Sequence, residues 1–154
     1  TLRARLSEAE AGGDPLCLLM CDIDNFKRFN DTWGHLVGDQ VIRFIAAVLR
    51  KYAEGDVLAA RYGGEEFALI MPRATLSGAR VLGSAINEAV KSKRLTRRST
   101  GESLGAVTVS IGIAQYRSGE SMSSFIGRAD ACLYGSKRAG RDRITTDAET
   151  ARAA

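Results

Sequence analysis

The chain has 154 residues and a net charge of +4, and 45% of its residues are hydrophobic and 26% charged. These values are typical of one globular domain and exclude a low-complexity or disordered chain. No apolar run approaches the roughly 20 residues that a membrane helix needs, and no signal peptide is visible, so we expect a cytoplasmic domain without direct membrane contact.

The spacing of the cysteines indicates the redox compartment of the protein, and its basic residues indicate what kind of partner it binds. The three cysteines lack zinc-ligand spacing, and Cys17 and Cys21 lie on one face of a predicted strand, which favours buried free thiols in a reducing cytoplasm. The basic stretch 91–98 contains no aromatic residues that stack on bases, so we interpret it as a solvated helix end and expect no nucleic-acid partner. The positive net charge still favours a phosphate-rich partner.

The first half of the chain predicts a helix, a buried strand and a second helix. The opening helix ends at a glycine pair, residues 12–13, and resembles the middle of a longer helix, as if the start of the domain had been cut away. The apolar run 16–24 predicts a strand that ends in acidic residues, and a loop is expected over 25–38. The next helix is amphipathic, with its inner face marked by Val41, Ile45, Val48 and Tyr52.

The second half begins with a predicted hairpin. The runs 57–62 and 66–71 flank Gly63 and Gly64, which can adopt the positive φ of a two-residue turn. The elements expected after it are a helix over 75–94, a strand over 106–115, a helix over 122–138 and a short strand over 143–146. This order favours an α+β fold with a βαββαβ core and helices on one sheet face. We expect a single domain over 1–154, with 145–154 as a tail.

Acidic residues stand at two predicted strand ends. Asp22 and Asp24 close the first strand on one face, and Glu65 and Glu66 follow the glycine pair. If the two strands are neighbours, Asp22 and one glutamate converge at the sheet edge, where their mutual repulsion favours a bound cation. Mg²⁺ takes one or two carboxylates together with substrate phosphates. Alternatively, the acids simply end strands at a wet surface and the glycines serve only the turn.

Other polar residues of the chain fit a bound nucleotide. They are Lys27, Asn30, Asp31, His35, Asp39, Lys137 and Arg141. Singly, each can be a solvated base, a helix cap, a turn residue or a first-turn acid. Together they supply bases for phosphates and an amide and a carboxylate for a base edge. A carboxylate accepts from the N1–H and the exocyclic amine of guanine, which favours guanine over adenine.

Three segments, DIDNFKRFNDTWGHLVGD, RYGGEEF and ADACLYGSKRAGR, resemble in order and spacing the signatures of the GGDEF family, the diguanylate cyclases, over residues 16–144. The resemblance implies a nucleotidyl-cyclase or palm-like fold, with a central, mostly antiparallel sheet flanked by helices. It also implies that two GTP molecules condense to cyclic di-GMP with release of two pyrophosphates. In this reaction two domains face one another as a homodimer, and each ribose 3′-hydroxyl attacks the α-phosphorus of the other GTP.

The resemblance also implies the catalytic and metal-binding residues. Asp22, the backbone carbonyl of Ile23 and Glu65 hold two Mg²⁺ or Mn²⁺ ions. Glu65 is the candidate for taking the proton of the 3′-hydroxyl, and Glu66 is its helper. Lys27 steadies the phosphate charge in the transition state.

For GTP binding, the same match implies that Asn30 and Asp39 read guanine and that His35 contacts the substrate. The remaining substrate-binding residues by this match are Phe26, Gly63, Gly64, Lys137 and Arg141, of which the last two grip the terminal phosphates.

The chain departs from the family pattern at the inhibitory product site, an Arg-x-x-Asp before the glycine pair. Counting back from Asp56 places Ala53 at the arginine position. Counting back from Val57 places Glu54 there. We therefore expect no product inhibition through this segment.

Two functions follow from the resemblance. One is an active diguanylate cyclase domain that works with a second copy and with an N-terminal sensor domain of the full-length protein. The alternative is a catalytically silent receptor or scaffold that binds GTP or cyclic di-GMP. The intact Gly-Gly-Glu-Glu-Phe at 63–67 favours the enzyme.

Overall fold

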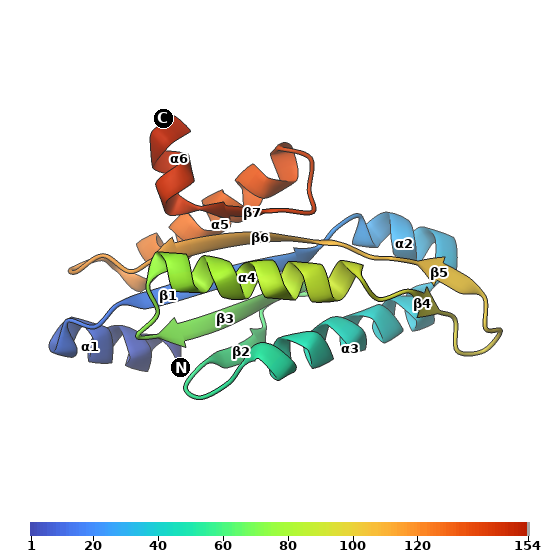
Figure 1. Ribbon diagram of the computed structural model, residues 1–154, viewed down its shortest axis with the longest axis horizontal. Helices are drawn as coiled ribbons and strands as arrows, with labels where there is room; N and C mark the ends of the chain where they lie inside the picture. Colours follow the sequence, from blue (N-terminus) through green and yellow to red (C-terminus); the bar gives the residue numbers. More distant parts are fainter. Residues whose placement is uncertain (154) are drawn as a thin grey trace.

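The computed structural model describes the backbone of residues 1–153 and the side chains of residues 1–150. Its elements are α1 (Leu2–Gly12), β1 (Leu16–Ile23), α2 (Phe26–Trp33), α3 (His35–Tyr52), β2 (Leu58–Arg61), β3 (Glu66–Pro72), α4 (Leu76–Lys91), β4 (Leu95–Thr96), β5 (Ser103–Gly105), β6 (Val109–Gln115), α5 (Met122–Arg138), β7 (Ile144–Thr146) and α6 (Asp147–Ala153). Figure 1 shows their arrangement.

Five strands form the central sheet in the order β2-β3-β1-β6-β7. β6 and β7 pair in parallel, and the other neighbours are antiparallel. The predicted mostly antiparallel sheet flanked by helices is therefore confirmed. None of the helices in the described part of the chain is long and apolar enough to cross a membrane.

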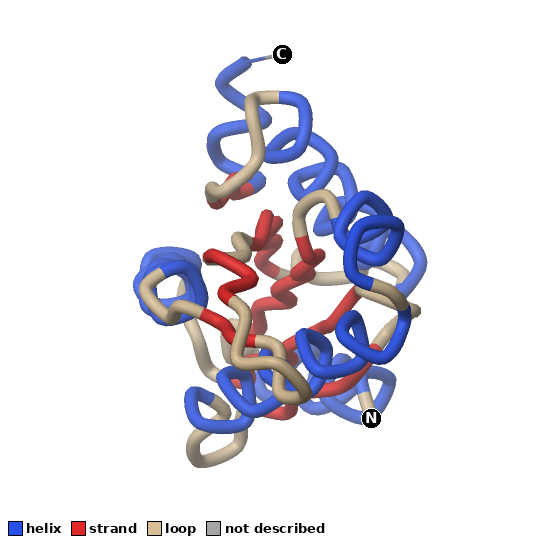
Figure 2. Tube along the Cα trace, turned by 90° about the vertical axis from the view of Figure 1, so that its right-hand side faces the viewer, coloured by secondary structure: helices blue, strands red, loops and turns tan. Residues whose placement is uncertain are grey.

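Helices cover both faces of the sheet, as the view in Figure 2 shows. Residues of α2, α3 and α4 pack in one hydrophobic cluster, and residues of α1 and α5 complete a second cluster on the opposite face. All eight residues of β1 are buried, because both faces of this strand are covered. The expectation of helices on one face is correct for the core helices α3 and α4 and wrong for the sheet as a whole.

Helix α5 packs directly on β6 because Gly112 leaves room for its backbone. A Cβ at this position would lie 2.1 Å from the amide nitrogen of Leu133 and 2.5 Å from the carbonyl oxygen of Ala129. This close packing fixes α5, which carries Lys137 in its last turn, over the strand beside β1.

The segment 25–38 is helical, and the loop expected there is wrong. It forms α2 and the first turn of α3, separated at Gly34. Phe26, Phe29 and Trp33 have helical spacing and pack against the core cluster of α3 and α4. This spacing, i, i+3 and i+7 with polar residues between, is the pattern of a short amphipathic helix, so the sequence does carry the signal for α2.

Smaller differences lie in the second half of the chain. The strand expected over 106–115 begins at Val109, and β4 and β5 form a short hairpin before it that was not predicted. Residues from 145 onward, expected as a tail, lie in β7 and α6 as far as Ala153. The bounds of α5 and the buried free state of all three cysteines are as predicted.

Candidate nucleotide and metal site

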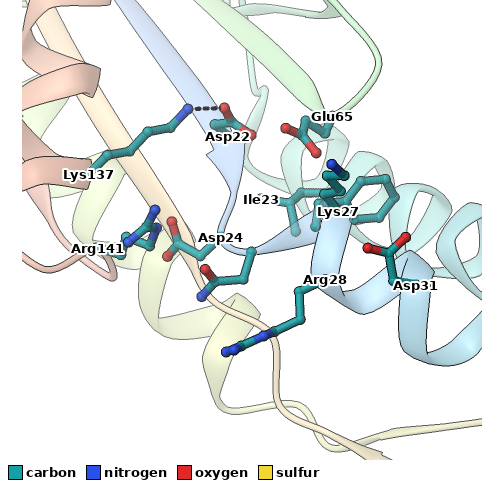
Figure 3. Close-up of a pocket in the computed structure, with 11 residues that line it drawn as sticks. Asp22, Ile23, Asp24, Lys27, Arg28, Asp31, Glu65, Lys137 and Arg141 are labelled. Carbon is teal, nitrogen blue, oxygen red and sulfur yellow. Dashed lines mark hydrogen bonds and ion pairs between the residues drawn. The ribbon is translucent and has the colours of Figure 1, made fainter.

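The two acidic clusters meet at one end of the sheet. β1 and β3 are antiparallel neighbours, so the end of β1 lies beside the start of β3, with Asp22 across from Glu66. The carbonyl of Glu65 accepts a hydrogen bond from the amide of Ile23 at 3.3 Å. Figure 3 shows the side chains of Asp22 and Glu65 at a shared pocket. The predicted convergence of Asp22 with the glutamates is confirmed.

Asp22 is a buried carboxylate with one oxygen satisfied and the other not. It is 6% exposed, and its Oδ2 accepts a hydrogen bond from Nζ of Lys137. Its Oδ1 is buried and has no hydrogen-bond partner among the described residues. Burial raises the pKa of Asp22, and the hydrogen bond and charge of Lys137 oppose this rise. A buried, unpartnered oxygen is costly, and a cation bound at this position would satisfy it.

The carboxylates of Glu65 and Glu66 also lie in an environment that disfavours their charged form. Burial, and then the charge of Asp22, raise the pKa of Glu65. Burial, and then the charge of Asp130 on α5, raise the pKa of Glu66. Asp130 was not predicted as a site residue. It precedes Lys137 by seven residues and therefore shares its face of α5, which is the sequence signal that could have indicated it.

The oxygen donors at this end of the sheet fit a hard divalent cation. No group of three or more His, Cys, Asp or Glu side chains in the described structure is arranged to hold a metal. The available donors are the carboxylates of Asp22 and Glu65 and the backbone of Ile23, which lines the same pocket. Because Mg²⁺ binds through one or two carboxylates plus substrate phosphates, this set fits a cation shared with a phosphate ligand.

The pocket with these acids has a volume of about 500 Å³ and basic residues on two sides. Lys137 and Arg141 come from the end of α5 and the loop after it, and Lys27 and Arg28 come from α2 (Figure 3). Arg28 was not predicted for the site. The volume is in the range of small-molecule clefts, and the charges suit a polyphosphate bound together with a cation.

A second cavity, of about 510 Å³, adjoins the first and shares its acids and Phe26. Asn30, His35 and Asp39 line it, so the structure brings together the residues predicted to bind the base. Oδ1 of Asn30 is buried and has no hydrogen-bond partner within the described residues. One cavity is thus lined by basic residues, and the other presents an amide and a carboxylate, groups suited to a base edge.

Gly38 on α3 leaves the space that the side chain of Asn30 occupies. A Cβ at position 38 would lie 1.8 Å from Oδ1 of Asn30 and 3.2 Å from Cζ of Phe26. This glycine lies in the segment DIDNFKRFNDTWGHLVGD, and no role was predicted for it. The structure indicates that it positions Asn30.

The Gly63–Gly64 connection differs from the predicted two-residue turn. The amides of Tyr62 and Gly63 both donate to the carbonyl of Glu66, at 2.8 and 3.0 Å, so the connection is longer. Neither glycine has a positive φ, and that expectation is wrong. Arg61 holds the connection instead, because its Nε and Nη2 donate to the carbonyls of Gly63 and Gly64 at 3.1 and 2.7 Å.

Protein packing does not require glycine at position 64. A Cβ there would meet nothing within 4 Å. An alanine side chain would therefore fit at this position as far as the surrounding protein atoms are concerned.

The fold is palm-like, with carboxylates at adjoining strand ends and basic residues around them. Residues 1–143 match the family model described as "Diguanylate cyclase, GGDEF domain". The chain therefore belongs to the GGDEF family.

Curated relatives agree with this assignment. Diguanylate cyclase VdcA of Vibrio cholerae is 44% identical over 132 residues, which make up 86% of this chain and 39% of the relative. The response regulator PleD of Caulobacter vibrioides is 38% identical over 144 residues, which make up 93% of this chain and 32% of the relative. The chain thus spans well under half the length of these relatives.

Solved structures of the family are similar to the whole described fold. The GGDEF domain of DgcB from Caulobacter crescentus, solved in complex with c-di-GMP, is 53% identical with a TM-score of 0.93, and the match covers 95% of this chain and 83% of that one. The active GGEEF domain of a diguanylate cyclase from Vibrio cholerae is 28% identical with a TM-score of 0.84, covering 93% of this chain and 89% of that one.

Proposed function

We propose that residues 1–154 form one diguanylate cyclase domain, which condenses two GTP molecules into cyclic di-GMP and two pyrophosphates. The observation that carries the proposal is the buried Asp22, whose unpartnered Oδ1 lies where the acids of β3 and the basic end of α5 meet. Membership of the GGDEF family supports the same reaction, and VdcA is named a diguanylate cyclase.

We propose that Asp22, the carbonyl of Ile23 and Glu65 hold two Mg²⁺ or Mn²⁺ ions. When bound, such ions neutralise phosphate charge and lower the pKa of an attacking hydroxyl. Glu65 accepts the proton of the ribose 3′-hydroxyl. Its pKa is raised by burial and by Asp22, which brings this base closer to the operating pH, and Glu66 assists it.

The basic residues position the triphosphate. Lys137 pairs with Asp22 in the structure, and we propose that it turns to the terminal phosphates of GTP together with Arg141. Lys27 on α2 lines the opposite side of the pocket and stabilises charge on the transferred phosphoryl group. Phosphoryl transfer depends on this positioning and charge neutralisation more than on covalent chemistry by the protein.

The second cavity binds the base. Asn30 and Asp39 read the guanine edge, and His35 and Phe26 contact the nucleoside. The backbone of the Gly63–Gly64 connection lies against the phosphates, which is possible because no Cβ intervenes.

One domain holds one GTP, so the reaction requires a second copy that faces it as a homodimer. In the full-length cytoplasmic protein an N-terminal sensor domain controls this pairing. Product inhibition through residues 53–57 is absent. The carboxylate of Asp56 is paired with Arg73 in the structure.

The test is incubation of the purified protein with GTP and Mg²⁺, with detection of the product by mass. We expect cyclic di-GMP, formed at a rate per domain that rises with protein concentration until the dimer saturates. Bound GTP without product at any concentration would favour the silent receptor. Asp39→Ala is expected to weaken discrimination against ATP, and an unchanged GTP/ATP preference would remove Asp39 from base recognition.

A further inference from the structure

We propose that Asp24 is a positioning residue, whose carboxylate holds the loop after α5 so that Arg141 faces the triphosphate. The inference deepens the proposed function and rests on it. It assigns to the second acid of the Asp-Ile-Asp sequence a role different from metal binding.

Both oxygens of the Asp24 carboxylate are occupied by protein donors. Oδ1 accepts from Oγ of Ser110 at 2.5 Å. Oδ2 accepts from Oγ1 of Thr108 at 2.7 Å and from the backbone amide of Asp142 at 3.0 Å. Asp24 therefore joins three segments, which are the end of β1, the start of β6 and the loop after α5. These bonds leave it poorly suited to ligate a cation, in contrast to Asp22, whose Oδ1 has no hydrogen-bond partner in the described part of the chain.

The loop that Asp24 holds has a backbone that needs support. Arg141 and Asp142 are consecutive non-glycine residues in the left-handed region, with φ of 66° and 48°. Residues other than glycine adopt this conformation rarely, and they keep it when the surrounding structure fixes them. The supports are Asp24, the carbonyl of Ser136, which accepts from the Arg141 amide at 3.0 Å, and Asn87, whose Nδ2 donates to Oδ1 of Asp142 at 3.0 Å.

The backbone of Arg141 sets the direction of its side chain. Within the described residues its guanidinium forms no hydrogen bond or ion pair, yet it lines the phosphate pocket beside Asp24 (Figure 3). Because no side-chain contact holds the guanidinium, releasing the loop from Asp24 lets Arg141 turn away from the pocket. The polar residues of the base half, Asn30, His35 and Asp39, come from α2 and α3, and no residue of this loop lines that cavity.

The test compares a triphosphate with a monophosphate. The probes are 3′-deoxy-GTP, which lacks the attacking hydroxyl, and GMP, each with Mg²⁺, and the dissociation constants are measured by calorimetry. We expect Asp24→Ala to raise the dissociation constant of 3′-deoxy-GTP about tenfold, which corresponds to about 1.4 kcal/mol. The dissociation constant of GMP should rise less than about twofold. Asp24→Asn keeps the shape of the side chain and one acceptor oxygen, so its dissociation constant for 3′-deoxy-GTP should lie between those of the wild type and Asp24→Ala. Equal losses for both probes, or no loss, would overturn the proposal.

A double-mutant cycle shows whether Asp24 acts through Arg141. In an Arg141→Met background, Asp24→Ala should not weaken the binding of 3′-deoxy-GTP any further. If Asp24 had a purely structural role, Asp24→Ala would weaken binding as much in this background as in the wild type. Asp24→Asn replaces it in the cycle if the alanine variant does not fold. Asp14→Ala, at the other end of β1, is the matched control and should change neither constant.

The outcomes separate this inference from the proposed function. A wild-type protein that binds neither probe and forms no product contradicts the proposed function. A wild-type protein that forms cyclic di-GMP, while its Asp24 variants keep the wild-type preference for the triphosphate, contradicts only the role of Asp24.

Discussion

The substitution Gly38→Ala should weaken nucleotide binding while it changes the folding stability little. The new methyl carbon would lie 1.8 Å from Oδ1 and 2.9 Å from Cγ of Asn30, distances that no relaxed structure allows. The asparagine side chain must therefore rotate out of its place. Such overpacking costs about 1 to 3 kcal/mol, and the low end applies because the clashing atoms belong to a side chain that can move. Replacing glycine within a helix returns roughly 0.5 to 1 kcal/mol.

We therefore expect the free energy of unfolding to change by about 1 kcal/mol or less, measured by urea denaturation. GTP binding should suffer more, because Asn30 no longer reaches the base. Loss of one such polar contact corresponds to a rise in the dissociation constant of about tenfold. The fluorescence of Trp33, the single tryptophan of the chain, can follow the titration because α2 also carries Asn30.

Gly127→Ala is the matched control. Gly127 lies inside α5, and a Cβ there would meet nothing within 4 Å. This variant should gain a few tenths of a kcal/mol or more in stability and bind GTP as the wild type does. If Gly38→Ala bound GTP with wild-type affinity, the positioning of Asn30 by Gly38 and the role of Asn30 in base binding would both be wrong.

Three further predictions concern charge. As the pH falls from neutrality toward the ordinary pKa values of aspartate and glutamate, the thermal stability of the metal-free protein should rise. Burial raises the pKa values of the acids Asp22, Glu65, Glu66 and Asp130, so the folded state takes up protons before the unfolded chain does. Scanning fluorimetry measures this, and a flat or opposite trend would contradict it. Lys137→Met should destabilise the metal-free protein by about 1 to 2 kcal/mol, since Asp22 then lies buried without a counter-charge and the lysine is partly exposed. Added Mg²⁺ should recover much of this loss, and the same loss with and without Mg²⁺ would argue against a cation at Asp22.

The sequence predicted that Asp22 meets one of the two glutamates if the first strand lies beside the hairpin, and β1 and β3 are indeed neighbours. It also predicted the bounds of α5, since its apolar face and flanking signals are strong. The eight-residue helix α2 was missed although its three aromatic residues have the i, i+3, i+7 spacing of an amphipathic helix.

Other parts of the site depend on contacts between distant segments. Asp130 lies near Glu66 only because α5 packs over β6 and β1, the strand that pairs with β3, and Asp24 reaches residue 142 across 118 positions of the chain. The space at Gly38 exists only once α2 packs on α3. These contacts are created by tertiary packing, and the spacing of the sequence shows only that Asp130 and Lys137 share a face of α5.

The most direct test of the account is binding of Mn²⁺ in the presence of 3′-deoxy-GTP, followed by electron paramagnetic resonance in the wild type and in Glu65→Gln. The wild type should bind Mn²⁺ together with the nucleotide. Glu65→Gln keeps the shape of the side chain and should lose most of this Mn²⁺ while remaining folded. Undiminished binding of Mn²⁺ by Glu65→Gln would contradict the claim that a cation bridges Asp22 and Glu65.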